Sequence, residues 1–273
     1  MYSFTSRFLG PLGAVLLVVA QAQAQAPVRP SAGAAAPSEE QSYHKEFVYG
    51  VNFNTQGGLL GGASVRSTRV LDDRMLRFWS IEGVMLKNAK EERRSTIVGG
   101  SYIYLKSNYA FVLRPSVGLQ RVLFRKAADA GVQVNALASA GPSFGLLLPY
   151  YIVYDRTSAG SIGTPPNGAN NDIVTEQFDP AKHTDVNSIL DRGPLFSGIG
   201  QTRVVPGFHL RGGLSFEYGR YRDAVTGLEV GVLVEGFTKR MLILSPTILS
   251  EKDVLNRQFF PSVYLTLYFG HRS

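Results

Sequence analysis

The sequence contains no cysteine. Disulfide bonds, thiolate metal sites, cysteine nucleophiles and a lipidated cysteine anchor are therefore excluded. Beyond its first residues the chain also lacks a long uninterrupted apolar run. The nearest candidate, residues 132–154, is broken by Gln133, Asn135, Pro142 and Pro149, whereas a membrane-spanning helix needs about 18 or more apolar residues. We therefore expect no membrane-spanning helix in that part of the chain.

Acidic side chains are fewer than basic ones: 21 Asp and Glu stand against 28 Lys and Arg, a formal net charge of +7. A basic protein can attract nucleic acid, but it can equally lie against anionic lipid headgroups. The N-terminal segment distinguishes these partners. Arg7 precedes an apolar run at residues 8–20, and residues 21–26 (QAQAQA) repeat the small–x–small pattern that signal peptidase cleaves.

We interpret residues 1–26 as a signal peptide that is cleaved after Ala24 or Ala26. An uncleaved N-terminal membrane anchor is the alternative, although the apolar run is short for a bilayer. Export argues against nucleic acid as a partner. Residues 27–45, which are rich in Ala, Pro and Ser, are predicted to be a disordered spacer, so residues 46–273 form the folded domain.

Apolar and polar residues alternate along this domain, the pattern of β-strands with two different faces. In one segment, for example, Leu228, Val230 and Val232 alternate with acidic or small residues. Soluble sandwiches also alternate, but their strands average about five or six residues, whereas a tilted strand that crosses a bilayer needs about nine to eleven. Eight segments qualify: residues 46–54, 58–70, 75–87, 101–114, 131–145, 206–220, 226–238 and 258–270.

Strands in lipid must close into a barrel, because no backbone polar group can stay unpaired there. The sequence therefore predicts an all-β fold, an antiparallel transmembrane β-barrel of eight strands in the bacterial outer membrane. With both chain ends in the periplasm, three of the four outward connections are long and most inward ones are short. The long outward ones are residues 88–100, 146–205 and 239–257, and the inward ones are 71–74, 222–225 and, as a longer exception, 115–130.

The connection at residues 146–205 is the long extracellular loop between strands 5 and 6, and its length indicates a functional element. Within it we expect residues 189–196 to fold back as a cap. The exceptional inward connection carries Arg121, Arg125 and Lys126. We interpret it as a solvated loop, with docking of a periplasmic partner or inner-leaflet phospholipid as the alternative.

Six polar residues are candidates for a site inside the barrel: His209, Arg211, Ser215 and Glu217 on one strand, with Glu229 and Glu235 on the next. They favour a structural network of paired charges, because an unpaired buried charge costs several kcal/mol. A lipid-modifying site is the alternative, but His209 and Ser215 are about 20 Å apart along one strand. We predict no catalytic, cofactor or metal site, since none of the four histidines has a partner histidine at metal-ligand spacing.

The chain also resembles a family of conserved outer-membrane β-barrel proteins of the Bacteroidota whose function is not established. The resemblance extends over residues 49–270 and is strongest in six stretches. It implies the fold and the location only. The stretches are residues 109–115 (YAFVLRP), 123–135 (LFRKAADAGVQVN), 140–151 (AGPSFGLLLPYY), 205–217 (VPGFHLRGGLSFE), 225–230 (VTGLEV) and 263–270 (VYLTLYFG).

Together these patterns predict a non-enzymatic outer-membrane barrel that serves as a structural or accessory component of an envelope or secretion assembly. Its expected partners are outer-membrane lipid or lipopolysaccharide and a protein of such an assembly. A narrow, porin-like passive pore and a lipid-modifying acyltransferase or deacylase remain the alternatives. An eight-stranded lumen is filled mainly by side chains, which counts against the pore.

Overall fold

The computed structural model describes residues 44–125, 131–157, 172–218, 224–245 and 255–273, all within one unit, residues 41–273. The predicted signal peptide and nearly all of the predicted spacer lie outside the described residues. No helix among the described residues is long and apolar enough to cross a membrane.

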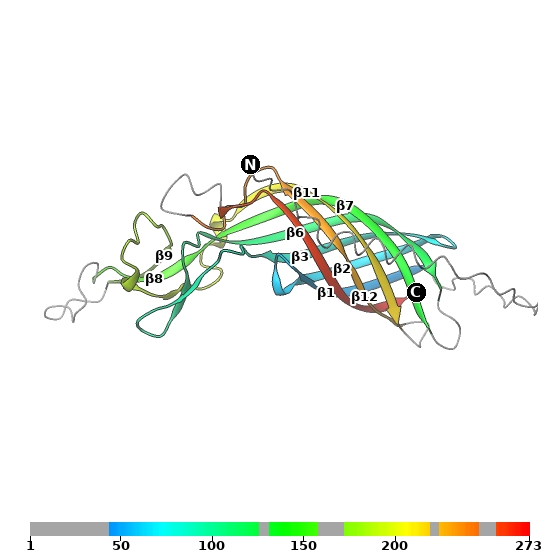
Figure 1. Cartoon of the computed structure of the whole chain (residues 1–273), viewed down its shortest axis with the longest axis horizontal. Coiled ribbons are helices and arrows are strands. Elements are labelled where there is room, and N and C mark those ends of the chain that lie inside the picture. Colours follow the sequence, from blue (N-terminus) through cyan, green and yellow to red (C-terminus); the bar gives the residue numbers. More distant parts are fainter. Residues whose placement is uncertain (1–43, 126–130, 158–171, 219–223, 246–254) are drawn as a thin grey trace, which may run out of the picture. The chain divides into compact units, whose positions relative to one another are not determined.

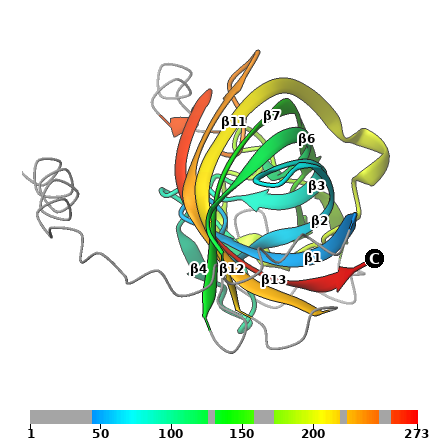
Figure 2. The same ribbon diagram turned by 90° about the vertical axis from the view of Figure 1, so that its right-hand side faces the viewer.

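Eight antiparallel strands close into a barrel, because the first strand pairs with both the second and the last (Figures 1 and 2). This confirms the predicted fold class. Apolar and polar residues alternate along each strand, and successive side chains point to opposite faces, so each strand has one apolar side and one polar side. The strands are β1 (Lys45–Asn54), β2 (Gly58–Asp72), β3 (Met75–Leu86), β6 (Asn108–Phe124), β7 (Val132–Pro149), β11 (Arg203–Tyr218), β12 (Ala224–Phe237) and β13 (Phe259–Arg272).

The fourth barrel strand was placed wrongly by the sequence pattern, which predicted residues 101–114. In the structure β6 continues through Pro115 to Phe124, and Arg121 lies on the strand rather than in a loop. Pairing with β7 is interrupted between Leu113↔Phe144 and Val117↔Ala140. Because proline has no amide hydrogen, it fits at such a gap. The connection from β6 to β7 is consequently short.

The barrel wall has opposite polarities on its two sides. Side chains that point outward are mostly apolar and exposed, such as Val117 at 67% and Val232 at 58%. Side chains that point inward include many buried polar and charged groups. All six predicted lumen residues point inward, as the alternation predicted.

The long connections lie together at one end of the barrel (left in Figure 1), which also has the short β1–β2 turn, opposite the β2–β3 turn and the C-terminus. We call residues 87–107, 150–157 and 172–202 the crown. It contains the sheet β10–β8–β9 and the β4–β5 hairpin around an aromatic core with Tyr150 at its centre. Its elements are β4 (Arg93–Ser95), β5 (Ser101–Ile103), β8 (Tyr151–Asp155), β9 (Ile173–Gln177), β10 (Ile189–Arg192) and the 3-10 turns η2 (Val186–Ser188) and η3 (Ile199–Gln201).

The expectation that residues 189–196 form a cap is wrong. Ile189 is fully buried in the crown core and β10 pairs with β8, while Phe196 is 60% exposed. Pairing with a neighbouring strand satisfies the backbone of this segment, so it belongs to the crown sheet. A different segment closes the barrel mouth, as described below.

Candidate functional site

The lumen holds a network of buried ion pairs that draws on seven of the eight strands. Four guanidinium groups face five carboxylates, and every one of these side chains is 12% exposed or less. Such charges are tolerated inside a protein only when they are paired and hydrogen-bonded. The members are Arg66, Arg114, Arg211, Arg272, Glu46, Glu82, Glu217, Glu229 and Glu235.

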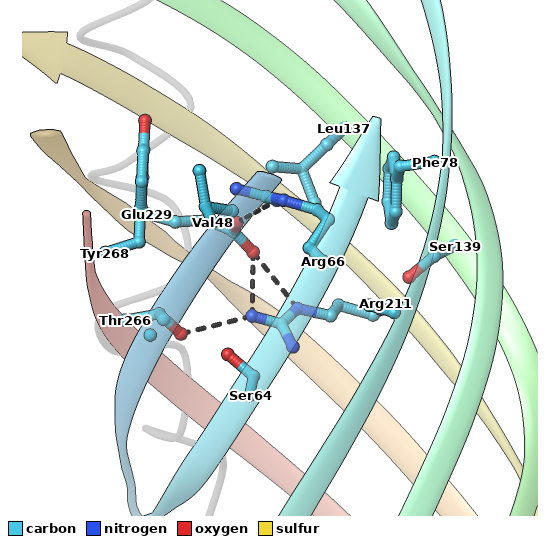
Figure 3. Close-up of a pocket in the computed structure, with 12 residues that line it drawn as sticks. Val48, Ser64, Arg66, Phe78, Leu137, Ser139, Arg211, Glu229, Thr266 and Tyr268 are labelled. Atoms are coloured by element: carbon cyan, nitrogen blue, oxygen red, sulfur yellow. Dashed lines mark hydrogen bonds and ion pairs between the residues drawn. The ribbon is translucent and has the colours of Figure 1, made fainter. Parts of the chain in front are cut away.

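Glu229 is the centre of this network (Figure 3). Its Oε1 accepts from Arg211 Nη2 at 2.7 Å and from the Tyr264 hydroxyl at 2.8 Å, while its Oε2 accepts from Arg66 Nη1 at 2.7 Å. The guanidinium of Arg211 also stacks on the Tyr264 ring, 3.8 Å from its centroid. Three strands, β2, β11 and β13, are therefore tied to β12 through one carboxylate.

A second group joins the first and lies nearer the crown. Arg114 binds both oxygens of Glu235, at 2.8 and 2.7 Å, and its Nη1 is 3.2 Å from Glu82. The other oxygen of Glu82 accepts from Arg211 at 3.3 Å. The charges thus alternate along one continuous chain, from Glu235 through Arg114, Glu82, Arg211 and Glu229 to Arg66.

Arg211 contacts Glu229, whereas Glu217 pairs with Arg272, which also binds Glu46 at 3.0 Å. Ser215 lies 2.6 Å from the Tyr268 hydroxyl.

His209 has a serine neighbour that the sequence did not reveal. Its Nδ1 is 3.0 Å from Oγ of Ser143, which comes from β7 and donates its hydrogen to Glu235 at 2.6 Å. Because the serine's single hydrogen goes to the carboxylate, Nδ1 of His209 must donate to the serine oxygen. A nucleophilic serine needs the reverse direction, and all three side chains are at most 2% exposed. The direction of these hydrogen bonds therefore does not activate Ser143.

The crown end of the lumen is closed by a short apolar segment of the β12–β13 connection. We call residues 241–244 the plug; Met241, Ile243 and Leu244 are at most 2% exposed. Gly145 makes room for the plug, since a Cβ there would stand 2.8 Å from Met241. The plug packs on inward-facing residues of six strands: Val84, Leu86, Ala110, Val112, Leu147, Val205, Phe237 and Phe260.

Asn256 fastens the plug. Its Oδ1 accepts from the amides of Ile243 and Leu244, at 2.9 and 3.0 Å, and its Nδ2 donates to the Leu244 carbonyl at 2.7 Å. Below the plug, a cavity of about 20 Å³ remains beside Arg66, Ser139 and Glu229, room for about one water molecule. The ion pairs and the plug thus occupy the middle and the crown end of the lumen.

The crown has polar features of its own. Glu176 accepts from Arg156 Nη2 at 2.6 Å and lies 3.3 Å from His183, which stacks on Phe178. The hydrogen bonds from Arg156 hold the pKa of Glu176 below its usual value, and His183 adds to this against the opposing effect of desolvation. Burial raises the pKa of Tyr150 to about 12, although its hydroxyl accepts from the Ile103 amide. Within the described part of the chain, no group of three or more His, Asp or Glu side chains is placed to hold a metal ion.

Comparison with known proteins gives a likeness in fold alone. No protein family and no curated protein matches the chain. One similar solved structure is Ail, the attachment invasion locus protein of Yersinia pestis, in complex with the heparin analogue sucrose octasulfate (8% identity, TM-score 0.36, covering 85% of this chain and 99% of that one). Another is Neisserial surface protein A, NspA (7% identity, TM-score 0.37, covering 85% and 97%). The resemblance to the Bacteroidota family stays a prediction.

Proposed function

We propose that this chain is a non-enzymatic outer-membrane β-barrel protein, a sealed anchor that holds the crown at the cell surface as an accessory component of an envelope assembly. The observation that carries the proposal is the reversed polarity of the barrel: the outward wall is apolar and exposed, and the lumen is charged. Contiguous apolar surface of this extent makes a protein aggregate in water, whereas it is what a bilayer requires. The predicted signal peptide supplies the export route.

The crown belongs on the extracellular side, because bacterial barrels have short periplasmic turns and longer outer loops. A protein partner of the crown is supported by the tip of the β4–β5 hairpin. There Ile97 and Val98 stand side by side, 74% and 62% exposed. Exposed apolar residues at an ordered tip suit contact with another protein better than contact with water.

Neither alternative function is favoured by the geometry. A passive pore would need an open lumen, but the plug and the ion pairs occupy it. A lipid-modifying enzyme would need a nucleophile that substrate can reach, but Ser143 and His209 are buried and hydrogen-bonded in the wrong direction. We therefore propose anchoring and recognition rather than transport or catalysis.

Fractionation tests the location. The full chain, expressed with its N-terminal segment in a bacterium with two membranes, should sediment with the outer membrane and resist extraction at alkaline pH. Its band should shift on gels when the sample is boiled, because folded barrels migrate differently from unfolded ones. Recovery as a soluble periplasmic protein would contradict both the location and the anchoring role.

Cross-linking and affinity purification from native membranes test the accessory role. The wild-type chain should retain a protein partner, and an Ile97→Ser/Val98→Ser variant should lose it while keeping the folded barrel band. A matched control, Phe196→Ser/Ile199→Ser, changes two exposed apolar residues elsewhere in the crown and should keep the partner. Equal partner recovery with all three proteins would contradict recognition through the hairpin tip.

A further inference from the structure

The outer wall of the barrel carries an unusual row of like charges at its short-turn end. Lys45 is the cross-strand partner of Arg69, and Arg69 is the partner of Arg77. All three side chains are exposed and lie on the outward face of their strands. Arg121 joins them diagonally, because its own partner on β3 is Met75, two residues before Arg77. Four positive charges thus meet on the outside of β1, β2, β3 and β6.

Among the described residues these four basic side chains form no ion pair, and Asp72 and Asp73 of the adjoining turn form none with them. Like charges directly opposite one another destabilise a sheet. An anion between them would convert that repulsion into attraction, as it does for basic side chains near an anionic membrane surface.

An apolar groove of about 680 Å³ starts at Arg77. Its floor is made of small residues, Ala138 and Ala140 of β7 and Gly212 of β11, and its sides include Leu119 and Val232. Five of the lining residues form a row across adjacent strands, because each is the cross-strand partner of the next: Arg77, Leu119, Ala138, Gly212 and Val232. Arg77 is two residues from the short-turn end of its strand, whereas Val232 is near the middle of β12. The groove therefore runs from the charged rim into the apolar wall.

We propose that this groove and the basic row form a binding site for an anionic glycerophospholipid of the leaflet on the short-turn side. The phosphate lies among Arg69, Arg77 and Arg121, where guanidinium groups donate charge-assisted hydrogen bonds to its oxygens. An acyl chain lies along the groove over Gly212. The inference rests on the proposed membrane location, and it adds a lipid class and named contacts to it.

Native mass spectrometry of the full chain tests the site, after folding into vesicles of phosphatidylcholine that contain phosphatidylglycerol. The wild-type barrel should retain phosphatidylglycerol in preference to phosphatidylcholine. The triple variant Arg69→Gln/Arg77→Gln/Arg121→Gln should lower that retention about tenfold or more. The control is Arg93→Gln/Arg203→Gln/Arg257→Gln, which removes three exposed positive charges at the crown end and should leave retention unchanged.

Gly212→Leu tests the groove without any change of charge. A Cβ at this position would find only one atom within reach, the Leu137 carbonyl oxygen at 4.0 Å, so the variant should fold and still displace the acyl chain. Retention equal to that of the wild type would overturn the groove, and equal loss in both triple variants would overturn the arginine site. A barrel that fails to insert into vesicles contradicts the membrane location. Insertion without preference for phosphatidylglycerol contradicts the lipid site alone.

Discussion

His209 and Glu235 are direct cross-strand partners in the lumen, but the loss of their interactions should have different effects on stability. Glu235 binds Arg114 through both oxygens, so Glu235→Gln leaves a buried guanidinium short of its charge partner and should cost about 3 kcal/mol or more. His209→Gln keeps a hydrogen-bond donor for Ser143 and should cost less than about 1.5 kcal/mol. Urea titrations in vesicles, read by the heat-modifiable band, measure both.

The His209→Gln variant also tests the structural interpretation of His209. If His209→Gln folds fully but fails to complement the phenotype of a deletion strain, His209 has a role that the network does not explain. The lipid A of that strain should then be compared with wild type by mass spectrometry, because an altered acylation pattern would point to the enzyme alternative. Full complementation supports the structural role.

Side-chain facing was predictable from the sequence, but side-chain partners were not. Because the period along a strand is two, alternation placed Arg211, Glu229 and the other four candidates correctly in the lumen. Partners on strands far apart in sequence depend on the register of the closed barrel, so the sequence does not reveal Arg66 and Ser143 as partners. Glu82 and Arg114 lie on the polar side of residues 75–87 and 101–114, a pattern that marks them as further lumen candidates.

Pro115 explains why the sequence pattern misplaced β6. Proline is a strand breaker by local rules, so the pattern ended the strand at residue 114. Pro115 lies in the middle of β6, and the residue close to it on β7 is a glycine. A Cβ at Gly141 would stand 2.1 Å from the Pro115 carbonyl oxygen. Only the pairing of two strands makes this visible.

The strand β12 offers a depth test of the membrane wall. Val232 and Thr226 both point outward, but Thr226 lies six residues closer to the short-turn end, about 20 Å along the strand. An arginine at the bilayer midplane costs about 2–4 kcal/mol, and one near the interface about 0–1. Val232→Arg should therefore destabilise the barrel in vesicles much more than Thr226→Arg. Equal effects in an equilibrium urea titration would contradict the assigned depth.

The plug should detach when Asn256 is replaced. Asn256→Ala removes the acceptor of two buried amides and the donor to one carbonyl, each worth about 1–3 kcal/mol when left unsatisfied. Met241, fully buried in the wild type, should then be oxidised by dilute peroxide. Peptide mass spectrometry measures this, with Met75 and Met85 of the barrel wall as internal references. Protection of Met241 in the variant would show that apolar packing alone holds the plug.

The crown should weaken in acid. The pKa of Glu176 is lowered in the folded protein by Arg156, so its contribution is present above the unfolded-state value of about 4.5 and is lost as the pH falls through the folded-state value. Hydrogen-exchange protection factors of β8 and β9 should decrease below about pH 4.5 in the wild type. Glu176→Gln should lower them slightly at pH 6, because an exposed ion pair contributes little, and should remove the part of the acid response that belongs to Glu176. A wild-type crown that stays equally protected at pH 3.5 would contradict this.

The whole barrel is closed twice, by apolar packing at the crown end and by ion pairs along the middle of the lumen. Either closure alone blocks water and ions, so loosening one should not open the other. In planar bilayers the wild-type chain and Asn256→Ala should both leave the baseline conductance unchanged. Combining Asn256→Ala with Arg114→Ala/Glu235→Ala removes the plug and one bidentate pair together, without leaving an unpaired charge at that pair. This combination should produce channel openings if it still gives the heat-modifiable band of a folded barrel. Stable openings of the wild-type chain would revive the passive pore, because they would mean that the plug leaves the mouth under ordinary conditions.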